Sequence, residues 1–106
     1  MLITNEQINQ VTQIIAKNCN PDKIILFGSY AEGMSNKDSD LDIAVIKETD
    51  TPNYLRSSEI RKYLRGMLIP MDIVVYTQPE IEEWKDVKQA FITQILQTGK
   101  VVYEKK

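Results

Sequence analysis

Five residues of this chain have types and spacing that suit the binding of phosphate groups and a cation. Gly28 and Ser29 follow the apolar run 24–27, which is typical of a short buried strand. Because glycine has no β-carbon, the backbone can turn sharply at Gly28 and approach a ligand. If Ser29 begins a helix, its hydroxyl and the unpaired backbone N–H groups there can bind phosphate oxygens.

The other three residues are aspartates. Asp40 and Asp42 stand two positions apart at the start of a predicted strand, so their side chains project from the same face. Asp72 lies in a second predicted strand, 71–76, and if the two strands are neighbours the three carboxylates converge. Two carboxylates about 4 Å apart repel by about 4 kcal/mol at an effective dielectric constant near 20, so such a cluster indicates a cation site. Carboxylate oxygens favour Mg²⁺ or Mn²⁺ over zinc.

Taken singly, these signals also have structural explanations. Gly-Ser occurs in many turns, and Asp-x-Asp is common at strand ends and helix caps. Asp72 is harder to explain in this way, because its neighbours in the sequence are residues that we expect to be buried, and a buried carboxylate is costly without a cation or a donor. The combination therefore favours a functional site.

The elements that must position these residues alternate between helices and strands, which predicts an α+β fold with a mixed sheet of about four strands flanked by helices. We expect a first helix over residues 5–17, opened by a capping box at 4–7, and a short helix over 29–34. The strand over residues 41–47 is apolar on both faces beyond the aspartates, which predicts a central place in the sheet. Residues 100–104 are the expected last strand.

Two further helical regions carry apolar stripes. The helix that begins at Thr51-Pro52 should bury Leu55, Ile60, Tyr63, Leu64 and Met67. The region from Pro79 to Gly99 places Ile81, Trp84, Val87, Phe91 and Ile95 on one face, unless Asp86 marks a break between two helices. Trp84 and Phe91 suit a base-stacking surface, but aromatic residues at helical spacing are more often core, and core is the favoured interpretation. For Arg56, Arg61, Lys62 and Arg65 a solvated helix face is favoured over a phosphate or partner contact.

Composition predicts one domain over residues 1–106, with 42% apolar and 26% charged residues. The net charge of −2 argues against stable, general nucleic-acid binding, which depends on many lysine and arginine contacts. The absence of histidine excludes histidine-based zinc sites and Ser-His-Asp triads, and a lone Cys19 cannot form an internal disulfide. No signal peptide or membrane span is visible, so we expect a cytoplasmic protein.

The segments ILFGSYAEG (25–33) and DSDLD (38–42) resemble the nucleotidyltransferase superfamily of DNA polymerase β type. The chain is most similar to the minimal nucleotidyltransferases, the antitoxins that pair with HEPN-domain toxins, and its ending ILQTGKVVYE (95–104) is also similar to theirs. One departure is Glu32, where many relatives carry an arginine, and this removes a positive contact to phosphate.

The resemblance implies the nucleotidyltransferase fold and Mg²⁺-dependent transfer of AMP from ATP to a tyrosine of the partner toxin. Asp40, Asp42 and Asp72 would then be the catalytic and metal-binding residues, with Gly28 and Ser29 binding the nucleotide. Larger superfamily members carry a further domain, so we expect a partner protein or a second subunit to complete the site. Two alternatives stay open: a non-catalytic module that masks the toxin, and nucleotidylation of a small molecule such as an aminoglycoside. The sequence does not select the nucleotide base.

Overall fold

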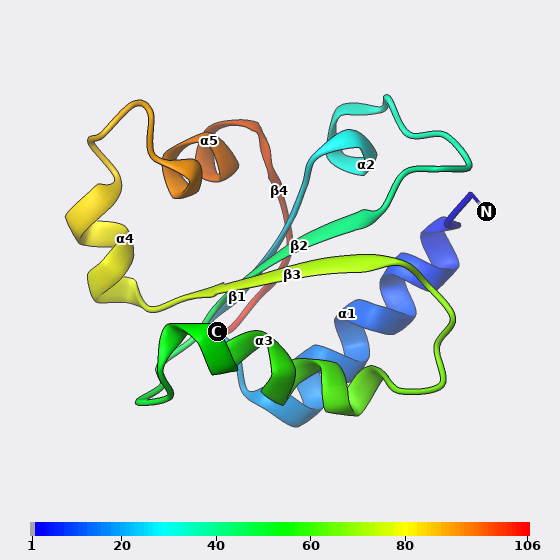
Figure 1. The fold of residues 1–106 in the computed structure, drawn as a ribbon, viewed down its shortest axis with the longest axis horizontal. Helices are drawn as coiled ribbons and strands as arrows, with labels where there is room; N and C mark the ends of the chain where they lie inside the picture. The colour runs from blue at the N-terminus through cyan, green and yellow to red at the C-terminus, as the bar shows by residue number, and fades with distance from the viewer. Residues whose placement is uncertain (1) are drawn as a thin grey trace.

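A computed structural model describes residues 2–106 of the chain, and Figure 1 shows a sheet with helices on both sides of it. Within these residues there are five α-helices, one 3₁₀ helix and four strands. In chain order they are α1 (Asn5–Cys19), β1 (Lys23–Phe27), α2 (Ser29–Glu32), β2 (Leu41–Ile46), α3 (Asn53–Arg61), the 3₁₀ helix η1 (Lys62–Leu64), β3 (Met71–Tyr76), α4 (Gln78–Trp84), α5 (Phe91–Thr98) and β4 (Lys100–Glu104). The predicted α+β class is confirmed. No helix in this part of the chain is long and apolar enough to cross a bilayer.

The four strands of the described residues form one mixed sheet in the order β3-β2-β1-β4. β1 runs antiparallel to β2 and to β4, whereas β2 and β3 are parallel and are connected through α3. β2 is therefore an interior strand, which confirms the prediction made from its apolar residues on both faces. β3 and β4 form the two edges of the sheet.

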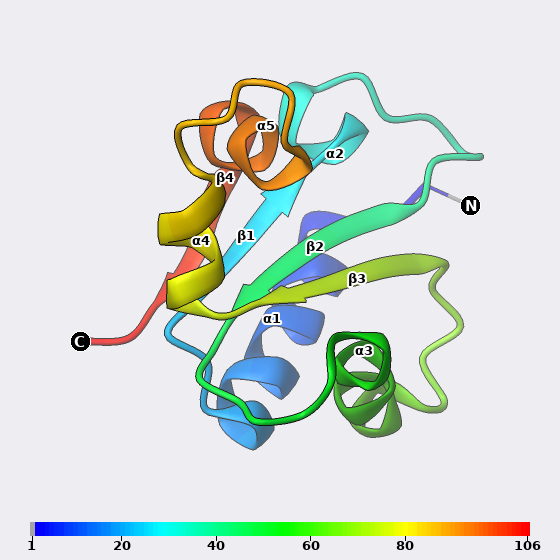
Figure 2. The same ribbon diagram turned by 60° about the vertical axis from the view of Figure 1, so that its left-hand side comes forward.

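Each face of the sheet packs against a different pair of helices, as Figure 2 shows. Leu41, Ile43 and Val45 of β2 pack in the core that includes α1 and α3. Ala44 and Ile46 pack in the second core, beneath α4 and α5. Because side chains alternate along a strand, Asp42 belongs to the same face as Ala44 and Ile46.

The first helix begins at the predicted capping box. The side chain of Thr4 accepts a hydrogen bond from the Gln7 backbone N–H at 3.1 Å, and the Gln7 side chain accepts one from the Thr4 N–H at 2.9 Å. Such reciprocal bonds satisfy backbone donors that a helix start would otherwise leave unpaired. The helix continues to Cys19, which is buried in the core.

The buried stripe predicted for the helix after Pro52 is only partly correct. Ile60 and Leu64 are buried, but Leu55 and Tyr63 are 44% and 41% exposed. The α-helix ends at Arg61 and the chain continues as a 3₁₀ helix. Because a 3₁₀ helix has three residues per turn, the 3.6-residue spacing no longer places Tyr63 on the buried face.

Two helices rather than one follow β3, and the break between them, residues 85–90, contains Asp86. The Thr93 hydroxyl donates a 2.8 Å hydrogen bond to the carbonyl of Trp84, which ties α5 to the end of α4. The two helices therefore do not share one continuous buried face. Trp84 and Phe91 are 46% and 50% exposed, so the interpretation of both as core residues is wrong.

Two arginines of α3 bind the edge strand β3. Arg61 donates to the carbonyl of Met71 at 2.8 Å. Arg56 donates to the Glu80 carboxylate at 2.7 Å and to the Val75 carbonyl at 3.4 Å. Because an edge strand presents unpaired carbonyls, these contacts close part of the edge. The Arg56 side chain is only 11% exposed, so the interpretation as a solvated helix face is wrong for Arg56.

Candidate active site

Gly28 forms the turn between β1 and α2. Its φ of 72° and ψ of −154° lie in a region that is open almost only to glycine. A β-carbon at this position would collide with the carboxylate oxygen Oδ2 of Asp42. The sharp turn predicted at Gly28 is confirmed, and glycine is required both by the backbone conformation and by the carboxylate that lies against it.

Ser29 is the first residue of α2, as the sequence predicts. The helix is a single turn, in which the N–H groups of Ala31 and Glu32 each donate to the Gly28 carbonyl at 3.1 Å. Glu32 is exposed at the end of this turn. Ser29 thus lies at the start of α2, directly after Gly28, which lies against Asp42. Phosphate binding by Gly28 and Ser29 stays a prediction.

Asp42 and Asp72 lie side by side on neighbouring parallel strands. Each is the second residue of its strand, and the register of β2 and β3 pairs them directly. Because they are directly paired, both side chains project toward the face covered by α4 and α5. Asp40 stands two residues before Asp42, immediately outside β2. The expectation that the strands of Asp42 and Asp72 are neighbours is therefore confirmed.

The three carboxylates differ in their exposure. Asp42 is half-buried, whereas Asp40 and Asp72 are exposed. The expectation of a buried Asp72 is wrong. Asp72 is the second residue of β3, which is an edge strand of the sheet. Burial raises the pKa of the Asp42 carboxyl, and the negative charges of Asp72 and then Asp40 raise it further. Asp72 and Asp40 are thus both close enough to Asp42 to act on its carboxyl electrostatically.

These residues fit a hard divalent cation by their chemistry. All three are oxygen donors, the suitable ligands for Mg²⁺ or Mn²⁺, and a cation would relieve the repulsion that raises the pKa of Asp42. The side chains do not stand in a finished ligand arrangement, since among residues 2–106 no group of three or more Asp, Glu, Cys or His side chains is arranged to hold a metal ion. An ion bound here would therefore draw the exposed Asp40 and Asp72 side chains toward Asp42.

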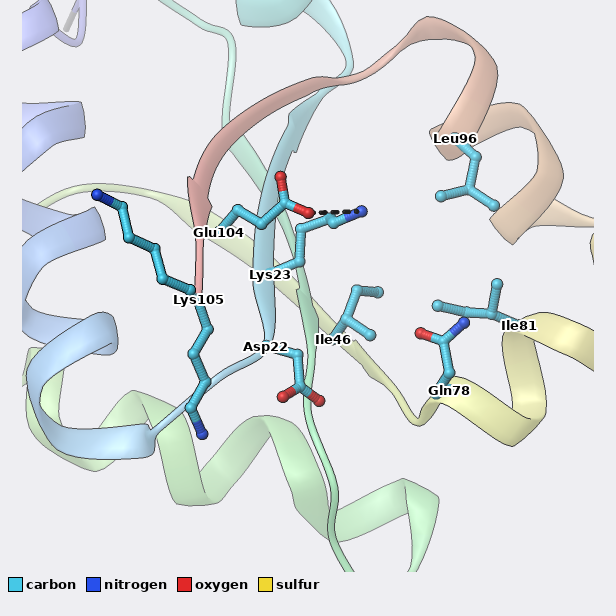
Figure 3. Close-up of a pocket in the computed structure, with 9 residues that line it drawn as sticks. Asp22, Lys23, Ile46, Gln78, Ile81, Leu96, Glu104 and Lys105 are labelled. Carbon is cyan, nitrogen blue, oxygen red and sulfur yellow. Dashed lines mark ion pairs between the residues drawn. The ribbon is translucent and has the colours of Figure 1, made fainter.

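A cavity near the C-terminus lies apart from these carboxylates. This cavity of about 480 Å³ lies between the sheet and the helices α4 and α5. Figure 3 shows residues that line it, among them Ile46 of β2 and Ile81 of α4. The ion pair between Lys23 and Glu104, 3.7 Å long, lies at its rim. Lys23 begins β1 and Ile46 ends β2, so this cavity is at the opposite end of the strands from Asp42. None of Asp40, Asp42 and Asp72 lines this cavity, and Asp40 and Asp72 are exposed to solvent.

Phe27 is a neighbour of this site that sequence reasoning did not single out. It is the last residue of β1, and the strand register pairs it with Asp42. Its ring contacts that of Phe91, the first residue of α5. The sequence carried one signal for this arrangement, the position of Phe27 directly before Gly28.

Comparison with known proteins identifies the family. The family described as Polymerase beta, Nucleotidyltransferase matches residues 9–106. Two similar proteins of Methanocaldococcus jannaschii carry the names Putative protein adenylyltransferase MJ0604 and Putative protein adenylyltransferase MJ1215. The first is 31% identical over 83 residues, which are 76% of this chain and 77% of that protein. The second is 36% identical over 61 residues, which are 57% of this chain and 70% of that protein.

Solved structures share the fold. A crystal structure of a toxin-antitoxin with AMP-PNP has a TM-score of 0.68 and 24% identity, covering 97% of this chain and 76% of that one. The structure of a tri-AMPylated Shewanella oneidensis HEPN toxin in complex with MNT antitoxin gives 0.55 and 22%, covering 92% of this chain and 69% of that one. The family match over most of the chain and the 31% identical relative lead to one assignment: the chain belongs to the polymerase beta nucleotidyltransferase family and is a nucleotidyltransferase, as its sequence motifs indicated.

Proposed function

We propose that this chain, acting as a single catalytic domain in the cytoplasm, transfers AMP from ATP to a tyrosine hydroxyl of a partner HEPN toxin and thereby neutralises it. The observation that carries the proposal is the direct pairing of Asp42 with Asp72 beside the Gly28 turn. The names of the relatives support protein adenylylation, and similar folds occur in toxin-antitoxin complexes, one of them with a tri-AMPylated HEPN toxin.

Each site residue has a role in this proposal. Asp40 and Asp42 would hold the Mg²⁺ ion that accompanies the triphosphate, and Asp72 would join them on a second ion. Gly28 and Ser29 bind phosphate oxygens through the backbone and the Ser29 hydroxyl. When bound, the ions lower the pKa of the attacking hydroxyl and neutralise the oxygens on which negative charge builds.

Asp72 is the proposed general base. Its carboxylate is exposed at the sheet edge, where an incoming tyrosine hydroxyl can reach it. As Asp72 takes the proton, a bond forms between the tyrosine oxygen and the α-phosphorus, and the bond from the α-phosphorus to the bridging oxygen of pyrophosphate breaks. Asp42 is half-buried against Gly28 and keeps a fixed position during this step.

The exposure of Asp40 and Asp72 supports a protein acceptor. A site that lies on an open surface leaves room for a protein to dock over it and to exclude water from the reaction. A toxin tyrosine carried on such a docked surface would be presented to Asp72 in a fixed orientation. Small-molecule acceptors are better served by an enclosed pocket.

The test is intact-protein mass spectrometry of the candidate partner, the protein encoded by the neighbouring gene, after incubation with this chain, Mg²⁺ and each nucleoside triphosphate in turn. We expect increments of AMP on the partner with ATP. The Asp42→Asn variant should lose the increments, whereas Asp86→Asn, which alters an exposed carboxylate between α4 and α5, should retain them. Increments with Asp42→Asn would refute the site, and tight complex formation without any increment would indicate a masking antitoxin instead.

A further inference from the structure

We infer that Phe91 is the surface on which the base of the bound nucleotide stacks. The inference rests on the proposed function and adds to it the residue that contacts the base. The structure supports it with three independent observations: the exposure of Phe91, its support from below, and its place beside Asp42.

Phe91 is exposed where an aromatic side chain would normally be buried. Phe91 is 50% exposed, while Ile92 and Ile95 on the same helix are buried, with only 2% and 1% of their surface exposed. These two isoleucines fix α5 against the sheet, and the Thr93 hydroxyl ties the helix to the Trp84 carbonyl at 2.8 Å. Phe91 is thus held on a fixed helix with much of its ring open to solvent.

The ring of Phe91 rests on the ring of Phe27. The two centroids are 5.5 Å apart and the planes meet at 82°, an edge-to-face arrangement. Phe27 is itself only 8% exposed. A ring packed in this way is oriented before any ligand arrives, which lowers the entropy cost of stacking another ring on it.

Phe27 links this ring to the carboxylates. Phe27 and Asp42 are direct cross-strand partners, with side chains on the same face, and the β-carbons of such pairs lie about 4.5–5.5 Å apart. Phe91 is therefore separated from Asp42 by one side chain. Figure 2 shows α5 next to the end of β1. This separation suits a nucleotide whose phosphates lie at Asp42 and Gly28 and whose base lies beyond the ribose.

The chemistry of the ligand follows from the ring. A phenylalanine face offers stacking without hydrogen bonds, so any base is accepted, and the larger faces of purines gain more than those of pyrimidines. We therefore expect ATP and GTP to bind more tightly than CTP and UTP. Inorganic tripolyphosphate, which has no base, should bind independently of Phe91.

The experiment measures binding of ATP and of tripolyphosphate, each with Mn²⁺, to the full chain by isothermal titration calorimetry. Base–aromatic stacking is worth about 1–3 kcal/mol by alanine substitution, so Phe91→Ala should weaken the affinity for ATP by about 5-fold to 150-fold. The affinity for tripolyphosphate should stay unchanged, and Phe91→Trp should restore ATP binding. Leu96→Ala is the matched control, because Leu96 is a 40% exposed apolar residue of the same helix that lines the distant cavity.

The outcomes separate this inference from the proposed function. ATP affinity within twofold of wild type in Phe91→Ala would overturn the inference, as would an equal loss of ATP and tripolyphosphate binding. Loss of the partner complex with unchanged ATP affinity would overturn it in favour of a docking role for Phe91. If the wild-type chain binds neither ATP nor tripolyphosphate, the proposed function itself fails.

Discussion

Replacement of Asp42 by asparagine should make the protein more stable while it abolishes transfer. Asparagine has nearly the shape of aspartate, so it can keep the place against Gly28 where the carboxylate lies. It removes, however, a half-buried negative charge that faces Asp72 directly and Asp40 nearby. The same charge that would hold a cation therefore destabilises the protein when no cation is bound.

The size of the effect can be worked from the pairing of the strands. Two unit charges about 4 Å apart interact by about 4 kcal/mol at an effective dielectric constant of 20 and by about 1 kcal/mol in water. Because Asp72 is exposed, the repulsion lies toward the lower value, and we expect Asp42→Asn to stabilise the fold by about 1–2 kcal/mol. For a domain of this size, about 1 kcal/mol corresponds to a rise in Tm of about 4–8 °C.

The pH dependence follows from the raised pKa of Asp42. Burial and then the charges of Asp72 and Asp40 raise that pKa above its unfolded value, so the folded protein holds the proton more tightly than the unfolded chain. Wild-type stability should therefore fall, relative to the variant, as the pH rises through the window between the unfolded and the folded pKa. The difference between the two proteins should be complete at neutral pH and should shrink in acid.

Thermal unfolding followed by circular dichroism, with and without Mg²⁺, tests this reasoning. Mg²⁺ should raise the Tm of the wild type through preferential binding to the folded state and should have little effect on Asp42→Asn. Asp86→Asn, in the exposed loop before α5, is the control for loss of a charge without the pairing. A variant less stable than wild type at neutral pH, or an equal Mg²⁺ response in both, would refute the electrostatic account.

Two further predictions concern the residues that support the site. Gly28→Ala should lose more stability in urea unfolding than Gly33→Ala. Gly33→Ala is the control, because it carries the positive-φ strain of about 1–2 kcal/mol but has no atom within 4 Å of the added β-carbon. Equal losses of stability in the two variants would show that the contact with Asp42 is unimportant. Glu80→Gln should cost about 1–3 kcal/mol at neutral pH by weakening the bond from Arg56. Burial raises the pKa of Glu80, but the hydrogen bonds from Arg56 and Thr77 outweigh it, so the pKa is lowered overall. The stability that Glu80→Gln loses, measured by urea unfolding, should therefore shrink as the pH falls through the lowered pKa of Glu80. A loss that does not change with pH would contradict this assignment.

The sequence was sufficient for the strands that carry the aspartates. β2 is apolar on both faces, a pattern that only an interior strand satisfies, and the run 71–76 had the length and composition of its neighbour. It was not sufficient for the exposure of Asp72, because apolar neighbours in a strand do not reveal whether the strand lies at an edge. The order β3-β2-β1-β4 depends on contacts between distant segments.

The break between α4 and α5 shows a second limit. Periodicity placed Trp84 and Phe91 on one helical face, and the same spacing continues across the break, so it could not decide between one helix and two. The position of α5 is set instead by Ile92 and Ile95 against the sheet and by the Thr93 hydroxyl on the end of α4. Because the helix is interrupted between them, Phe91 does not share a helical face with Trp84, and its ring packs against Phe27 instead.

The two paired aspartates occupy strands with different exposure, and this difference suits different tasks. Asp42 is on the interior strand, half-buried, and held against a glycine that cannot be replaced without collision. Asp72 is on the edge strand and exposed, and the carbonyl of the preceding residue is fixed by Arg61. The proposed transfer to a protein hydroxyl would use Asp42 as a fixed ligand and Asp72 as an accessible base, since the nucleotide must be held while the acceptor arrives from outside. The mixed sheet provides both in neighbouring positions because its parallel pair joins the interior to the edge.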